Sequence, residues 1–218
     1  MASPSPRFAP RDWLEDPLFR GHDEALTALL DFDTWPSANE LHEALSALVE
    51  RGLGGPMRFR AQVLHEPLRY EAAIVTAREV PTRDASPHDL LNALIWATFP
   101  RAKFALHRRF HEAEQLRTVP GRTRFQDRLA LLDEGAVLRS PDGNVQRAVV
   151  FGHAILEHRI GGSNAARAEL FELISMQSAP TPAIIDEAFA TTLRGWPDPA
   201  PPRIPGIPIL ELFPEATV

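Results

Sequence analysis

The chain has 218 residues, of which 44% are hydrophobic and 24% charged, and its formal net charge is −6. This composition is typical of a globular protein, and the absence of cysteine excludes disulfides, thiolate metal sites and a cysteine nucleophile. The negative charge argues against a protein whose whole surface binds nucleic acid. Because no apolar run is long enough for a membrane helix or a signal peptide, we expect a cytoplasmic protein with no membrane partner.

The first predicted elements are two helices. Residues 23–30 favour a short helix and residues 37–51 a longer one. The longer helix begins with Ser37 and Glu40 at the spacing of a capping box, carries a leucine stripe, and ends before Gly52.

A hairpin is predicted next. Polar and apolar residues alternate at 58–63, which indicates a half-buried strand, and residues 70–75 are a second strand candidate. His65-Glu-Pro67 lies between them as a predicted turn. We therefore expect these two strands to pair.

The rest of the body is predicted to be mainly helical. Ser86 and Pro87 are typical of a helix start, and Pro100 separates two consecutive helices. A short strand is expected after Gly135, whereas residues 148–158 fit either a helix or a strand. The further helices are predicted at 88–99, 101–117, 125–132, 165–174 and 184–193.

Proline is concentrated at the two ends of the chain. Of 21 prolines, four lie in the first 17 residues and seven from Pro197 onwards, so we expect extended termini at 1–20 and 197–218. Four Ile/Leu residues within 201–210 indicate that the tail docks on the body. The predicted fold class is α+β: a mainly helical single domain, residues 1–218, with a small antiparallel sheet or hairpin and extended proline-rich termini.

The first segment that can carry chemistry is the start of the helix at 88–99. His88 and Asn92 are four residues apart and share a face, with Asp89 beside them. Polar groups next to a buried stripe are reasonable metal ligands or general bases. The alternative is local: Asp89 favours the helix dipole, and the other two satisfy nearby backbone.

The second segment is Asp133-Glu134-Gly135, at the end of an apolar helix. Two adjacent carboxylates oppose the helix dipole there, and a bound cation or a neighbouring arginine would offset the cost. The alternative is a solvated turn, which acidic residues before glycine commonly form.

The third segment is 151–158, where the chemistry depends on the secondary structure. In a helix His153 and Glu157 would lie ~6 Å apart on one face and could bind one metal ion. In a strand they would stand ~13 Å apart and could not. A buried salt link is the alternative role.

The basic residues are unevenly chosen and placed. Of 23 basic residues, 22 are arginine and only Lys103 is lysine, which either marks a need for a compact ammonium group or arises by chance. Residues 101–128 carry eight basic and three acidic side chains, a local charge of +5. This stretch could contact phosphates or RNA, but the solvent-exposed face of an amphipathic helix is the simpler interpretation, which argues against nucleic acid as a partner.

Several common signatures are missing from the sequence. It has no phosphate-binding glycine loop, no dinucleotide fingerprint, no Gly-x-Ser-x-Gly elbow and no His-Glu-x-x-His motif. These absences argue against the common nucleotide-dependent and hydrolase classes, and we expect no nucleotide cofactor.

The chemical segments resemble an uncharacterised bacterial family of domains of unknown function, DUF3025. The longest shared pattern is His-Asp-x-x-Asn-Ala-Leu-x-Trp-x-x-Phe-Pro-x-x-Lys at 88–103; others are at 80–83, 127–134, 152–157 and 204–208, so the similarity spans roughly 66–210. The resemblance implies no reaction. It implies that the shared pattern includes His88, Asp89, Asn92, Lys103, Asp133, Glu134, His153 and Glu157.

Two functions remain open. In the first, the protein is a metal-dependent hydrolase acting on a phosphate ester or similar small substrate, and a divalent ion activates water. Lys103 would stabilise developing charge, Asp133 or Glu134 would act as base or orient a ligand, Asn92 would join this catalytic set, and the metal ligands would be His88, Asp89, His153 and Glu157. In the second, the same residues form a buried network in a non-enzymatic binding domain. A metal site requires the two imidazoles to converge within ~5 Å.

Overall fold

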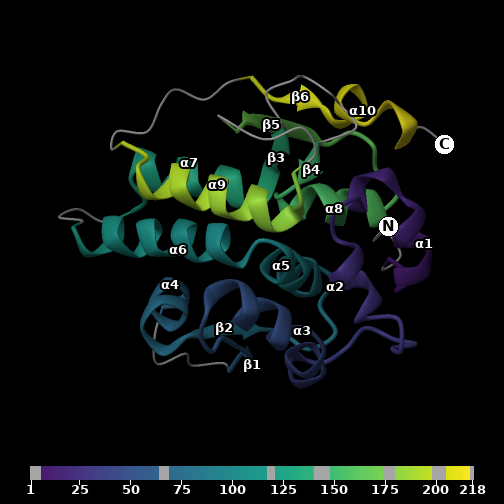
Figure 1. The fold of residues 1–218 in the computed structure, drawn as a ribbon, viewed down its shortest axis with the longest axis horizontal. Helices are drawn as coiled ribbons and strands as arrows, with labels where there is room; N and C mark the ends of the chain where they lie inside the picture. Colours follow the sequence, from purple (N-terminus) through teal and green to yellow (C-terminus); the bar gives the residue numbers. More distant parts are fainter. Residues whose placement is uncertain are drawn as a thin grey trace.

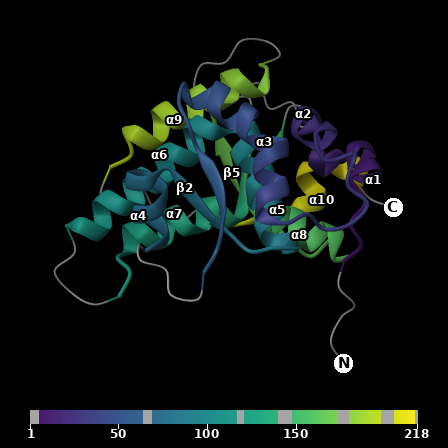
Figure 2. The same ribbon diagram turned by 90° about the horizontal axis from the view of Figure 1, so that it is seen from below.

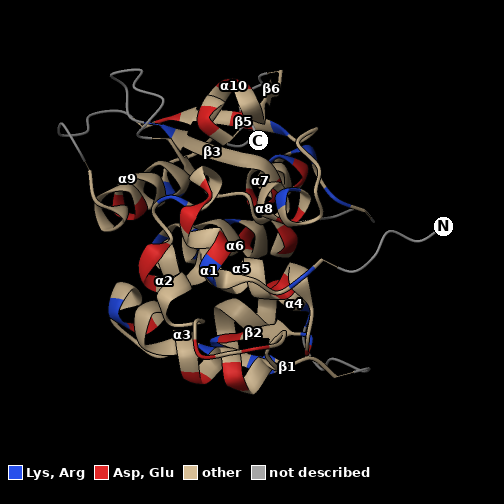
Figure 3. Cartoon of the chain, turned by 90° about the vertical axis from the view of Figure 1, so that its right-hand side faces the viewer, with Lys and Arg blue, Asp and Glu red and all other residues tan. Residues whose placement is uncertain are grey.

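The computed structural model describes residues 6–63, 69–116, 121–139, 148–173, 180–197 and 205–216. In this part of the chain the fold is mainly helical α+β with two small sheets. The elements form layers (Figures 1 and 3). Strands β1 (Arg58–Ala61) and β2 (Glu79–Thr82) lie at one end, and helices α5 (Pro87–Thr98) and α6 (Pro100–Gln115) cross the middle. The larger sheet lies at the opposite end with α10 (Ile209–Leu212).

The middle layer consists of α5 (Pro87–Thr98) and α6 (Pro100–Gln115). The Ser86 hydroxyl accepts a hydrogen bond from the Asp89 amide and caps α5, as predicted. Pro100 ends one helix and begins the next, because proline cannot donate within a helix but fits its first turn. Most of α5 is buried, including Trp96, which is fully buried.

The layer around β1 includes helix α3 (Ala38–Leu53). Its predicted capping box is confirmed: the Ser37 amide donates to Glu40 Oε2 at 2.7 Å, and the Glu40 amide donates to Ser37 Oγ at 3.3 Å. Leu41 and Leu45 are buried on the side that packs against α5 and α6. Seen from below, α3 lies across α5 (Figure 2).

The predicted hairpin is wrong. Strand β1 (Arg58–Ala61) pairs in parallel with β2 (Glu79–Thr82), and no antiparallel partner of β1 lies among the described residues. Residues of the second predicted strand form the short helix α4 (Tyr70–Ala72) and a π-helical turn (Ala73–Ala77). A short apolar run fits a strand or a helix equally well. Here the run lies in the helical connection between the parallel strands β1 and β2, and its residues Ala73 and Ile74 are buried. The predicted turn at 65–67 lies outside the described residues.

The larger sheet has the order β4-β3-β5-β6 and is mixed rather than antiparallel. Strands β3 (Ala136–Arg139) and β5 (Arg167–Glu172) pair in parallel, while β4 (Val149–Val150) and β6 (Ile207–Pro208) pair with them antiparallel. The strand expected after Gly135 is thus confirmed. The helix expected at 165–174 is wrong, since β5 occupies this segment between two partner strands, and tertiary pairing overrides local preference.

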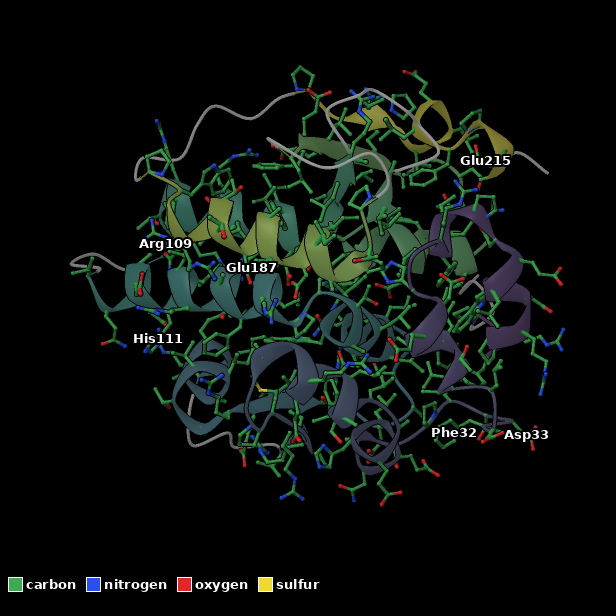
Figure 4. The ribbon with its side chains drawn as sticks, viewed as in Figure 1. Phe32, Asp33, Arg109, His111, Glu187 and Glu215 are labelled. Carbon is green, nitrogen blue, oxygen red and sulfur yellow. The ribbon has the colours of Figure 1, made fainter. Side chains whose placement is uncertain are left out.

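Three more helices pack against this sheet or beside it. They are α7 (Arg124–Gly135), α8 (His153–Ile160) and α9 (Pro182–Arg194), so 148–158 is a short strand followed by a helix. Helix α9 packs along α6, and Figure 4 shows Arg109 of α6 and Glu187 of α9 near their interface. Beyond the end of α9, Arg109 Nη2 donates a hydrogen bond to the Trp196 carbonyl oxygen at 2.7 Å.

The expectation of extended termini is not met in the described residues. The N-terminal segment forms α1 (Pro10–Glu15), a 3-10 turn (Pro17–Phe19) and α2 (Asp23–Thr27), and the C-terminal segment forms β6, α10 (Ile209–Leu212) and a 3-10 turn (Pro214–Ala216). Several of these prolines occupy first turns of helices, where a missing N–H costs nothing. Trp13 and Phe213 are buried, so both segments dock on the body.

One hydrophobic cluster runs through the described residues, from Phe8 to Ala216. None of the helices in the described part of the chain combines the length and the apolar character needed to span a bilayer.

Candidate metal centre

Three helices bring the candidate ligands together. His88 lies in the first turn of α5, Glu134 at the end of α7 and His153 at the start of α8, and α8 packs against both other helices. The close approach of α7 and α8 depends on Gly152. A Cβ there would lie 2.4 Å from the Gly135 amide nitrogen and 2.5 Å from the Glu134 carbonyl group, so only glycine fits.

The ligand atoms form a compact group. Nε2 of His88 lies 3.2 Å from Nε2 of His153, which lies 3.3 Å from Oε2 of Glu134, and all three side chains offer atoms within 4.8 Å of one another. The two imidazole rings have centroids 4.5 Å apart, inside the distance that a shared metal requires. These three residues are therefore a candidate metal-binding group.

The outer nitrogen of each ring is held by an oxygen. His88 Nδ1 lies 2.9 Å from Glu157 Oε2, and His153 Nδ1 lies 2.9 Å from the Asp133 carbonyl oxygen. A carbonyl and a carboxylate only accept hydrogen bonds, so both Nδ1 atoms carry the proton and donate. In the neutral rings both Nε2 atoms are then acceptors 3.2 Å apart, and a proton or a cation between them would relieve this contact.

The spacing of these atoms suits one divalent ion. Two ligands bound at about 2.0–2.1 Å in tetrahedral geometry are separated by about 3.3 Å, which is close to both observed distances. Two histidines and one glutamate are a ligand set of catalytic zinc sites, and metal-bound histidines almost always donate their other N–H to a carboxylate or carbonyl. Both features are present here.

The surroundings of the site favour the neutral form of His153. Burial lowers the pKa of His153 to about 4, with Lys103 and His88 adding to the effect, so this ring is neutral near pH 7. Burial, together with the nearby Asp133 charge, raises the pKa of Glu134. Burial alone would raise the pKa of Asp133, but the positive charge of Lys103, its hydrogen bond and the nearby imidazoles of His107 and His153 together outweigh burial and hold that pKa well below the usual range.

Lys103 lies behind the ligands and is fully buried. Its ammonium group donates to Asn92 Oδ1 at 2.8 Å and to the Asp133 carboxylate. Asn92 in turn donates to the Tyr70 hydroxyl at 3.1 Å. The single lysine of the chain thus fixes the residue whose carbonyl orients His153.

The eight residues singled out in the sequence are brought to one region, but not in the arrangement expected. Glu134 joins the two histidines, whereas Glu157 orients His88 from behind. Asp89 does not belong to the candidate metal-binding group found in the described part of the chain. Its carboxylate accepts from the Arg83 amide at 2.6 Å and from the guanidinium at 2.8 Å, which lowers its pKa against the effect of burial.

A cavity of about 420 Å³ opens beside the group, a size typical of small-molecule sites. His88, Glu134 and His153 line it, and so do residues that sequence reasoning missed, among them Tyr70, Glu71, His107 and Arg122. His107 stands one helical turn after Lys103 on α6, so the spacing could have pointed to it. Tyr70 and Glu71 gave no such signal, because they lie in the segment mistaken for a strand.

Comparison with known proteins shows a similarity to one family over part of the chain and gives no activity. Residues 57–147 match the family described as protein of unknown function (DUF3025), which confirms the resemblance seen in the sequence. The matched segment contains His88, Lys103 and Glu134 and ends before His153. Searches of curated proteins and of solved structures gave no match.

Proposed function

We propose that this protein is a metal-dependent hydrolase in which His88, Glu134 and His153 hold one divalent ion, preferably zinc. The observation that carries the proposal is the approach of the two Nε2 atoms to 3.2 Å, with the Nδ1 atom of each ring held by an oxygen on the opposite side. A third ligand, Glu134, lies within reach on the same side.

Three protein ligands leave a tetrahedral ion one open position. When bound there, the ion would supply Lewis-acid chemistry, activating water and polarising the substrate. Glu157 would keep His88 in the correct tautomer and orientation, and the Asp133 carbonyl would do the same for His153.

Lys103 has a different role in this proposal from the one its charge first suggested. Its side chain has no exposed surface, so it does not reach a substrate in the cavity. It is a positioning residue that keeps Asp133 ionised and in place. Because the pKa of Asp133 is held low, this carboxylate is a weak base, and we assign it no proton transfer.

The substrate is proposed to be a small ester, with a phosphate ester as the first choice. The cavity has room for a molecule of modest size, and a divalent ion together with Arg122, which lines the same cavity, suits a substrate of negative charge.

The test is hydrolysis of bis-p-nitrophenyl phosphate and p-nitrophenyl phosphate by the full chain loaded with Zn²⁺ or Mn²⁺. We expect turnover that chelation removes and that His153→Ala lowers by at least 100-fold. His158→Ala is the matched control, because this exposed histidine lies on the same helix outside the candidate group. Equal rates for wild type and His153→Ala would refute the proposal.

A non-enzymatic binding domain is the second candidate. The Lys103 ammonium group donates hydrogen bonds to Asn92 and Asp133. Such a buried polar network is what a purely structural role requires. In that case His88 and His153 would share a proton instead of a metal, and the protein would bind no zinc at neutral pH.

A further inference from the structure

The cavity has a second polar end, away from the candidate metal ligands, built around His107. This side chain is 2% exposed and lines the cavity with Glu71 and Tyr70. Its ring stacks on Trp96, with centroids 5.4 Å apart and planes 5° apart, and packs edge-on against Tyr70. These contacts fix the ring rigidly.

The hydrogen bonding of His107 is incomplete. Its Nδ1 lies 2.7 Å from Glu71 Oε2, and because a carboxylate only accepts, this nitrogen carries the proton. In the neutral ring Nε2 is then an acceptor, and this buried atom has no hydrogen-bond partner among the described residues. A buried acceptor without a donor is costly, so the site is prepared for a donor that enters the cavity.

Helix α5 gives the scale of the separation between the two ends. His88, Asn92 and Trp96 follow one another at intervals of four residues along one face, with the candidate ligand first and the partner of the His107 ring last. Eight residues at 1.5 Å each span about 12 Å. The distance between the His107 end and the metal ligands is thus about the length of one small molecule.

An arginine stands beside this second end. Arg122 lines the same cavity and is exposed, and its guanidinium lies 5.5 Å from the ring centre of Phe110, one helical turn after His107. No carboxylate in the described part of the chain forms an ion pair with it. An unpaired arginine held against an aromatic ring suits an anion such as a phosphate or carboxylate.

We propose that the His107 end binds a small hydroxylated anion, its phosphate or carboxylate on Arg122 and a neighbouring hydroxyl donating to His107 Nε2. That this anion is part of a substrate cleaved at the other end rests on the proposed hydrolase function. The binding itself needs only His107, Glu71 and Arg122.

The test compares sn-glycerol 3-phosphate with propyl phosphate, which lacks the hydroxyls, by calorimetric titration of the full chain with and without zinc. We expect a preference of about tenfold for glycerol 3-phosphate, as a hydrogen bond to a buried acceptor supplies. The preference should persist without zinc, so failure of the metal site would not remove it. His107→Phe should abolish the preference and leave propyl phosphate binding unchanged, while Arg122→Gln should weaken both ligands by a similar factor.

A second measurement needs no variant. In a ¹⁵N spectrum of the imidazole groups, glycerol 3-phosphate should shift the His107 Nε2 resonance of the wild type, whereas propyl phosphate should not. Equal affinity for the two ligands, a preference that survives His107→Phe, or no binding of either at millimolar concentration would overturn the proposal. A normal zinc titration in the same samples would show that the metal site stands even so.

Discussion

Replacing Lys103 by methionine should destabilise the protein far more than the loss of one surface charge. The Lys103 side chain is fully buried, and its ammonium group pairs with Asp133, whose side chain is only 17% exposed. Lys103→Met keeps the apolar stem but leaves the carboxylate without its cation and Asn92 without its donor. Breaking one side of a buried ion pair costs about 3–5 kcal/mol, and we expect a loss of stability in that range.

A double-mutant cycle tests whether this cost belongs to the pair. Asp133→Asn alone should also be strongly destabilising, because it strands the ammonium group, whereas the double variant should lose about 2–3 kcal/mol less than the sum of the two. The assay is urea unfolding followed by circular dichroism at pH 7. The control is Arg108→Met, since this exposed residue of the same helix forms a surface i,i+4 pair with Glu112, and its replacement should cost less than about 0.5 kcal/mol.

The result for Lys103→Met that would refute this reasoning is a stability within about 1 kcal/mol of wild type, or strict additivity in the cycle. Lys103→Arg extends the test. The charge is kept, but a planar guanidinium must fit a fully enclosed space, so overpacking should cost about 1–3 kcal/mol. A neutral effect would show that the single lysine in a chain of arginines is there by chance.

Three further predictions follow from the packing and the charges. Gly152→Ala should weaken zinc binding by at least tenfold and destabilise the fold by about 1–3 kcal/mol, because the new Cβ meets the backbone of Gly135 and Glu134; Gly55→Ala, which has open space, is the control. Glu157→Gln should lower zinc affinity about 10–100-fold in a competition titration, since it removes the carboxylate behind His88. Burial lowers the pKa of His22 to about 4 from 6.5, so between these values the unfolded chain binds more protons and the free energy of unfolding falls as the pH falls. The slope from this one residue approaches about 1.4 kcal/mol per pH unit, and urea titrations from pH 7 to pH 4.5 should show it reduced in His22→Gln.

Each of these predictions can fail clearly. Wild-type zinc affinity in Gly152→Ala would mean that zinc binding does not require the close approach of α7 and α8. An unchanged affinity in Glu157→Gln would remove the orienting role of this carboxylate. A wild-type pH slope in His22→Gln would show that other groups cause the acid sensitivity.

The sequence predicts the helices well where the local signal is complete. Ser37 and Glu40 cap α3, and Pro100 divides α5 from α6, because capping and proline effects act within one turn. It fails at 70–75 and 165–174, where short apolar runs fit either structure. There the partner strand decides: β5 exists because β3 and β6 lie on its two sides.

The residues of the candidate site were foreseen better than their arrangement. Spacing left open whether His153 and Glu157 share a helix, which they do, and it says nothing about contacts between helices. Glu157 turns to His88 instead of completing a shared site, and Glu134 arrives from the preceding helix through the contact at Gly152. The polar end around His107 and Glu71 was missed because it is assembled from α6 and α4, two segments far apart in the chain.

The most direct test is a metal titration of the purified full chain, with metal content measured by plasma mass spectrometry and affinity by calorimetry. A site made by His88, Glu134 and His153 predicts one zinc ion per chain at pH 7, lost in His88→Ala and in His153→Ala but retained in His158→Ala. A wild-type protein that holds no divalent metal, or one that holds it equally well without His153, would contradict the metal centre.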